Sequence, residues 1–170
     1  MKCRINRKGL IIFGAVILLM LIIFVFSAQN GGESNGISMT VTRFFAGILF
    51  FDYDQMSAEQ QAFICEHLNH FVRKGAHFSV YLLMGAFSYL AVRLSGLRLR
   101  FRFVPALCLC AVYAAADEIH QYFTPGRSPK LTDVLIDISG AVCGILIIKL
   151  IFIVVSHAKD AIKNKNGHAE

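Results

Sequence analysis

The chain has 170 residues, of which 56% are hydrophobic and only 16% are charged, and its formal net charge is +6. This composition is too apolar for an ordinary soluble domain, and the length fits about one domain. The positive charge does not indicate a nucleic-acid partner, because the basic residues lie beside apolar runs, where a small membrane protein carries them. Some attraction to anionic lipid headgroups is expected as a consequence.

Four apolar runs are long enough to cross a membrane, since a helix of about 20 residues spans the hydrocarbon core. They predict transmembrane helices near residues 9–29, 74–93, 103–123 and 132–155. The alternation typical of a membrane barrel strand is absent from the sequence. We therefore expect an all-α, polytopic membrane protein, built as a four-transmembrane-helix bundle in a single domain over residues 1–170.

The first run also has features of a signal peptide, because basic residues precede it. It is longer than an ordinary signal core, however, and Phe26-Ser27-Ala28 is a poor cleavage site. We expect it to stay in the membrane as an anchor.

Basic residues near the membrane ends predict the orientation of the chain. They lie before the first run, between the second and third, and after the fourth: Lys2, Arg4, Arg7, Lys8, Arg93, Arg98, Arg100, Arg102, Lys159, Lys163 and Lys165. These segments are expected in the cytoplasm, together with both termini. Residues 30–73 and 124–131 then face outward.

The long outer segment divides into two parts. The sequence NGGESNG, residues 30–36, is typical of a turn-rich loop. Ser57 to Val72 is predicted as a short helix at the outer interface, because Ser57 and Gln60 fit a capping box and the segment has a partly apolar face. This helix is expected to lead into the second transmembrane helix, and the alternative is that it is a merely structural link.

The third run ends in AADEIHQYFTPGR, residues 115–127, where polar side chains replace apolar ones. The predicted topology brings this ending to the same depth as polar residues of the second and fourth helices. The side chains share helix faces, and ionisable residues in membrane helices are expensive and usually functional. We therefore predict a pocket open to the outer leaflet, whose ligand-binding residues are Lys74, His77, Tyr81, Asp117, Glu118, Gln121, Arg127, Asp133 and Asp137.

The charges of this set do not balance, because Lys74 and Arg127 stand against four carboxylates. A raised carboxylate pKa, a protonated His77, a divalent cation or a cationic ligand would each compensate. A purely structural alternative is that Lys74 and Arg127 pair with the carboxylates and lock the bundle. No soluble cofactor is evident in the sequence.

Two further features each allow two interpretations. Arg127 in Pro125-Gly126-Arg127 is suited to bind a phosphate bidentately, or it follows a simple turn and extends to the interface. Gly140 and Gly144 form a GxxxG pair, which allows another helix to approach closely. The approaching helix is either another helix of the same chain or a helix of a second copy in a homo-oligomer.

Three blocks of this sequence resemble the VanZ-like family of bacterial membrane proteins: KGAHFSVYLLMG at 74–85, DEIHQYFTPGR at 117–127 and DVLIDISGAVCG at 133–144. The resemblance carries over the candidate residues above, with Asp137 the least close match because Asn is also usual there. It implies a multi-pass protein of the bacterial cytoplasmic membrane. The namesake of the family is linked to lowered susceptibility to teicoplanin, a lipid-tailed glycopeptide.

The sequence is compatible with three functions. The first is an envelope protein whose pocket binds a membrane lipid, a lipid-linked cell-wall precursor or a lipid-tailed antibiotic. The second is a membrane enzyme acting on a lipid phosphate or cell-wall precursor, with His77, Asp117, Glu118 and Asp133 as its catalytic residues. The third is an ion-coupled transporter.

Overall fold

The computed structural model describes residues 6–96 and 101–167. It contains α1 (Arg7–Ser27), α2 (Gly31–Leu49), the 3₁₀ helix η1 (Tyr53–Gln55), α3 (Ala58–Leu94), α4 (Phe103–Tyr122) and α5 (Leu131–Gly167), and no strand within those ranges. Four of these helices, α1, α3, α4 and α5, are long and apolar enough to cross a membrane. The prediction of an all-α, multi-pass membrane protein is confirmed. Lys2, Arg4, Arg98 and Arg100 lie outside the described residues.

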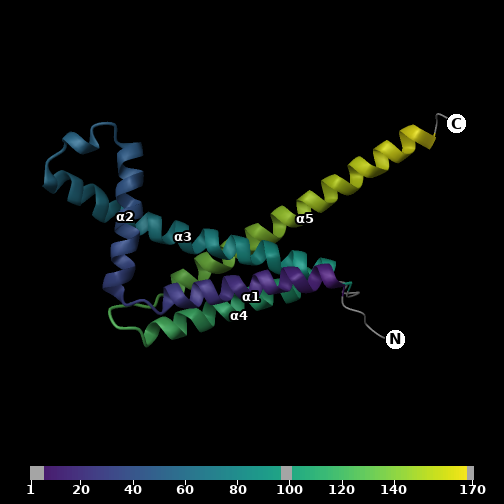
Figure 1. Cartoon of the computed structure of the whole chain (residues 1–170), viewed down its shortest axis with the longest axis horizontal. Coiled ribbons are helices and arrows are strands. Elements are labelled where there is room, and N and C mark those ends of the chain that lie inside the picture. The colour runs from purple at the N-terminus through teal and green to yellow at the C-terminus, as the bar shows by residue number, and fades with distance from the viewer. Residues whose placement is uncertain (1–5, 97–100, 168–170) are drawn as a thin grey trace.

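Helices α1, α3 and α4 run in roughly the same direction, α5 crosses α3 at an angle and extends past them, and α2 lies across the bundle at the end where α1 and α4 finish (Figure 1). Large apolar side chains cover the outside of the bundle, among them Leu10, Leu18 and Leu21 on α1 and Leu150 on α5. Such a surface suits lipid, because hydrocarbon tails are as apolar as these side chains. The long axis of the bundle is therefore the direction in which the chain crosses the membrane.

Helices α3 and α5 share the most extensive helix contact in the bundle, and glycines on both helices bring their backbones close together. A Cβ atom at Gly140 would overlap the carbonyl oxygen of Phe78, and one at Gly144 would overlap that of Leu82. From the other side, Gly85 lies against the backbone of Ala141. The prediction that the GxxxG pair admits a close helix is confirmed, and the helix it admits belongs to the same chain.

The prediction of a turn-rich loop over residues 30–36 is wrong, because these residues begin α2. Asn30 caps this helix through a hydrogen bond of 2.9 Å from the Glu33 amide, and Glu33 favours the first turn by its charge. Gly31 is small where the backbone of the α4–α5 loop passes, and its amide donates to the Pro125 carbonyl over 3.0 Å. Capping and tertiary contact therefore outweigh the low helix propensity of the glycines.

The helix predicted over residues 57–72 exists, but it is not a separate short helix. It forms the first part of α3, a continuous helix of 37 residues that begins with the predicted capping box of Ser57 and Gln60. Gly75 does not break the helix, and nothing lies within 4 Å of a Cβ added there. The fourth predicted helix is also longer than expected, since α5 continues past residue 155 to Gly167.

A small second core fixes α2 on the first part of α3. Ala46, Tyr53 and Cys65 are buried together, and the Tyr53 hydroxyl lies 3.0 Å from the Cys65 sulfur. Polar contacts continue along the same contact face, because the buried Thr42 hydroxyl donates to Asn69 over 3.1 Å and Asn69 donates to Asn35 over 2.8 Å. These contacts hold α2 across the end of the bundle, where it forms one wall of the candidate site.

Candidate functional site

A cavity of about 310 Å³ lies between α1, α2, α3 and α4, at the end of the bundle where α2 crosses it. Its walls are mainly apolar, with contributions from Ile22, Ile23, Phe26, Ile37, Val41, Val72, Val80 and other residues. Polar groups from α3, α4 and the α4–α5 loop enter the same cavity. This combination of an apolar wall with a few converging polar groups is typical of small-molecule sites.

Five of the nine predicted site residues line this cavity: His77, Tyr81, Asp117, Gln121 and Arg127. Asp117 and Gln121 are one helical turn apart on α4, both are buried, and the Gln121 side-chain amide donates to the Asp117 carboxylate over 3.0 Å. Tyr81 is buried on the facing side of α3. The predicted faces of α3 and α4 therefore meet around the cavity.

The other four residues, Lys74, Glu118, Asp133 and Asp137, do not line the cavity. Lys74 forms an ion pair with Asp133, which connects α3 to α5. One turn further along, His77 Nδ1 lies 3.2 Å from Oδ1 of Asp137, whose side chain is fully buried. The structural alternative therefore applies to Lys74, but the ion pair leaves the cavity residues available for a ligand.

Glu118 has a separate position on α4. Its carboxylate accepts a hydrogen bond from the Lys130 backbone amide, directly before α5 begins at Leu131. The side chain is buried. Glu118 therefore fixes the loop between α4 and α5, and through that loop it holds Arg127 beside the cavity.

Arg127 contacts α1 rather than a carboxylate. Its Nε donates to the Gln29 carbonyl over 3.2 Å, and its Nη2 donates to the Phe26 carbonyl over 3.0 Å. The last carbonyls of a helix lack partners within the helix, so the guanidinium caps the end of α1. Burial lowers the pKa of Arg127, but an arginine keeps its charge near neutral pH. The side chain lines the cavity and does not simply extend to the interface.

The chain also matches the VanZ/LLP1 family over residues 12–153, a range that contains the whole cavity lining. The chain belongs to the VanZ/LLP1 family. It matches no curated protein and no solved structure. Its four membrane-spanning helices and its family together make it a multi-pass membrane protein.

The sequence prediction missed the wall of the cavity that α2 forms. This wall consists of Ser34, Ile37, Ser38 and Val41. The signal for this wall was present, because Asn30 precedes Glu33 by three residues and Ile37 and Val41 have helical spacing. The glycines at 31, 32 and 36 obscured it. Arg73 was also missed, although it precedes Ala76, His77 and Val80 of the lining at helical spacing.

Metal binding stays a prediction for this VanZ/LLP1 chain. Within residues 6–96 and 101–167, no group of three or more His, Cys, Asp or Glu side chains lies close enough together to hold a metal ion. All four carboxylates considered above have partners within the chain: Asp133 has Lys74, Asp137 has His77, Glu118 has the Lys130 amide and Asp117 has the Gln121 side-chain amide. A divalent cation is therefore not needed to explain their positions.

Proposed function

We propose that this cavity binds the lipid part of a lipid-linked or lipid-tailed molecule, with the polar headgroup near Arg127. The observation that carries the proposal is the composition of the cavity along the bundle axis. Ile22, Ile23 and Val80 supply apolar lining within α1 and α3, beside the polar Tyr81 and Asp117, whereas Gln29 and Arg127 line the cavity just beyond the ends of α1 and α4. An amphiphile in a membrane has the same order of apolar and polar parts.

The orientation of the chain belongs to the same proposal. Among the described basic residues, Arg7, Lys8 and Arg102 lie near the end of the bundle opposite the cavity, and Lys159 and Lys163 lie on the extension of α5 beyond that end. Basic residues mark the cytoplasmic side. The cavity then opens toward the outer leaflet of a bacterial cytoplasmic membrane, where lipid-linked cell-wall precursors and lipid-tailed antibiotics are accessible.

Reduced susceptibility to teicoplanin-type glycopeptides is the cellular effect that we propose for this binding. The reason for this proposal is the match to the VanZ/LLP1 family, together with the resemblance noted in the sequence, whose namesake is linked to that effect. Binding of the lipid tail, or of the precursor that the antibiotic seeks, would change drug action at the membrane surface. A glycopeptide without a lipid tail, such as vancomycin, provides the comparison.

The experiment uses one pair of matched variants in α3. Ala76→Phe fills the cavity, because Ala76 is part of its lining, whereas Ala62→Phe adds the same bulk at another exposed position of α3 outside it. We expect the wild type and Ala62→Phe to protect a susceptible Gram-positive host against teicoplanin more than against vancomycin, at equal membrane levels. Protection should be lost with Ala76→Phe. Equal protection against both drugs, or full protection by Ala76→Phe, would contradict the proposal.

Catalysis on a lipid phosphate is the second candidate function, and fewer of the residues that it requires line the cavity. Of the four residues considered for it, His77 and Asp117 line the cavity, whereas Glu118 and Asp133 are bonded outside it. Histidine and carboxylate side chains are the types of group that act as general acid and base. Hydrolysis of a polyprenyl phosphate by the purified protein, lost in His77→Gln, would favour this function over binding alone.

A further inference from the structure

The polar end of the cavity contains two arginines from separate parts of the chain. Arg73 lies on α3 and Arg127 lies in the α4–α5 loop, and both side chains line the cavity while only partly exposed. Burial lowers the pKa of Arg127, and the like charge of Arg73 in the same cavity lowers it further. Two like charges therefore stand at one end of a largely apolar cavity.

Neither arginine forms an ion pair in the described part of the chain, although the more distant carboxylates of Asp117 and Glu118 favour the charge of Arg127. The ion pairs found there are Lys74 with Asp133 and His77 with Asp137. Arg127 uses Nε and Nη2 on helix carbonyls, which neutralise no net charge. Partly buried cations that repel each other and have no carboxylate in direct contact are unfavourable, and an anionic ligand between them would relieve the repulsion.

The arginines also lie at a defined distance from the apolar part of the cavity. Val80 follows Arg73 by seven residues on the same helix, which corresponds to about 10 Å along the axis. Asp117 lines the cavity from α4 and would repel an anion placed beside it. The anion is therefore expected at the arginine end, with an apolar chain extending past Val80.

We propose that Arg73 and Arg127 together bind the phosphate of a phosphate-bearing lipid, and that Arg73 selects this ligand over neutral lipids. The inference rests on the proposed function, which requires only a lipid chain in the cavity. To that function it adds the chemical class of the headgroup, a phosphate, and the residue that recognises it, Arg73. Guanidinium groups suit this role because each presents a planar pair of donors to a phosphate.

The test compares three probes against the purified full chain in detergent. Farnesyl phosphate has the chain and the phosphate, farnesol has the same chain without the phosphate, and inorganic phosphate has no chain. Affinities are measured by microscale thermophoresis with the wild type, Arg73→Gln, Arg73→Lys and the control Arg43→Gln. Arg43 is exposed on α2 and is absent from the cavity lining, so its substitution makes the same change in charge outside the site.

We expect the wild type and Arg43→Gln to bind farnesyl phosphate at least tenfold more tightly than farnesol. Arg73→Gln should lose about tenfold in affinity for farnesyl phosphate and keep its affinity for farnesol, and Arg73→Lys should recover part of the loss. Arg127→Gln should show the same loss, and its thermal unfolding must be measured in parallel because Arg127 also caps α1.

The remaining outcomes separate the two proposals. Equal binding of farnesol and farnesyl phosphate by the wild type overturns the phosphate inference and leaves lipid binding intact. Wild-type-like selectivity in Arg73→Gln also overturns the role of Arg73. Absence of binding to both farnesyl probes overturns the proposed function itself. Inorganic phosphate that binds as tightly as farnesyl phosphate, with the same loss in Arg73→Gln, supports the arginine site and overturns a lipid as its ligand.

Discussion

Lys74 and Asp133 form an ion pair between two neighbouring helices. Their ion pair connects α3 to α5 at positions with 21% and 16% side-chain exposure. Removing one partner leaves a poorly hydrated charge without compensation, whereas removing both leaves none. We predict that Lys74→Met and Asp133→Leu each destabilise the protein, and that the double variant is more stable than the sum of the two losses implies, with a coupling of about 1–3 kcal/mol.

Unfolding of the four proteins by SDS titration measures this double-mutant cycle. A coupling near zero would show that the two side chains act independently. Farnesyl phosphate binding provides a second readout, because neither residue lines the cavity. The double variant is expected to keep its affinity within about threefold, a difference worth about 0.6 kcal/mol.

The contact between α3 and α5 is the element-scale feature most sensitive to substitution. A Cβ atom at Gly144 meets the Leu82 carbonyl and the Ala86 amide, which are backbone atoms that cannot move aside as a side chain does. Gly144→Ala is therefore predicted to destabilise the bundle by about 1–3 kcal/mol.

Gly14 provides the matched control for this prediction. It lies in α1, and nothing lies within 4 Å of a Cβ added there. Gly14→Ala should be neutral or stabilise the protein by up to about 1 kcal/mol, because alanine is the better helix former. Thermal unfolding in detergent distinguishes the two variants, and equal midpoints would argue against close packing of α3 on α5.

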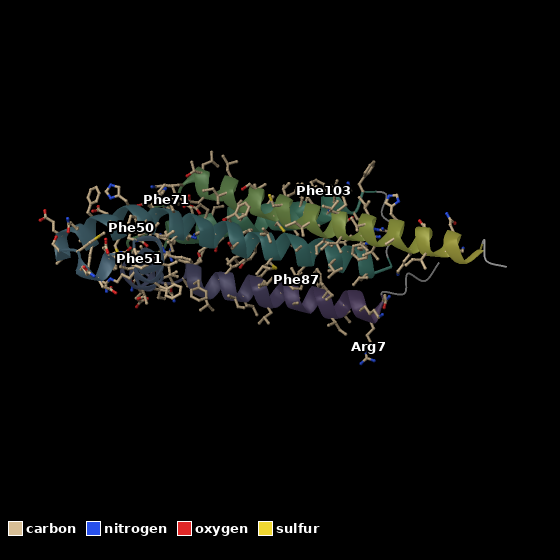
Figure 2. The ribbon with its side chains drawn as sticks, turned by 90° about the horizontal axis from the view of Figure 1, so that it is seen from above. Arg7, Phe50, Phe51, Phe71, Phe87 and Phe103 are labelled. Carbon is tan, nitrogen blue, oxygen red and sulfur yellow. The ribbon has the colours of Figure 1, made fainter. Side chains whose placement is uncertain are left out.

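The second half of α2 is expected to lie in the membrane interface. It exposes Phe44, Phe45, Ile48 and Leu49, and the chain continues through Phe50 and Phe51. Figure 2 places Phe50 and Phe51 at the end of the molecule opposite Arg7. A helix that lies across the bundle at this end, with aromatic side chains exposed, is typical of an interfacial helix.

Tryptophan fluorescence tests the position of α2, because the chain contains no tryptophan. Phe51→Trp in vesicles should be quenched most by lipids brominated near the headgroup. Phe24→Trp, at an exposed position of α1, should be quenched most by lipids brominated deep in the acyl chains. Quenching of Phe51→Trp by aqueous acrylamide as strong as that of free tryptophan would place α2 in water.

At the scale of the whole molecule, the sequence predicted what depends on hydrophobic runs and on helix periodicity. The four spans, the GxxxG contact and the shared faces of α3 and α4 are of this kind. The α2 wall was missed because its stability comes from a cap and from contacts with α3, which local propensity does not include. The sequence prediction included Glu118 and Asp133 in the pocket because they lie at the same expected depth in the membrane as the other polar residues. Depth alone does not determine which partner a side chain bonds.

Charge distribution predicts that both termini lie in the cytoplasm, and reporter fusions test this. The basic residues Arg7, Lys8, Arg93 and Arg102 lie near the end of the bundle away from the cavity, which the positive-inside rule assigns to the cytoplasm. A green fluorescent protein fused after residue 170 should fluoresce, and alkaline phosphatase fused there should stay inactive. The reverse pattern would turn the cavity toward the cytoplasm.

The central claim, that the cavity holds a lipid chain, is tested most directly by the lipids that co-purify with the protein. Wild type, Ala76→Phe and Ala62→Phe are purified from bacterial membranes under the same mild conditions, and their bound lipids are quantified by mass spectrometry. One lipid class should be enriched over the bulk membrane in the wild type and in Ala62→Phe, and lost from Ala76→Phe. The same bulk-like lipid profile in all three proteins would contradict lipid binding in the cavity.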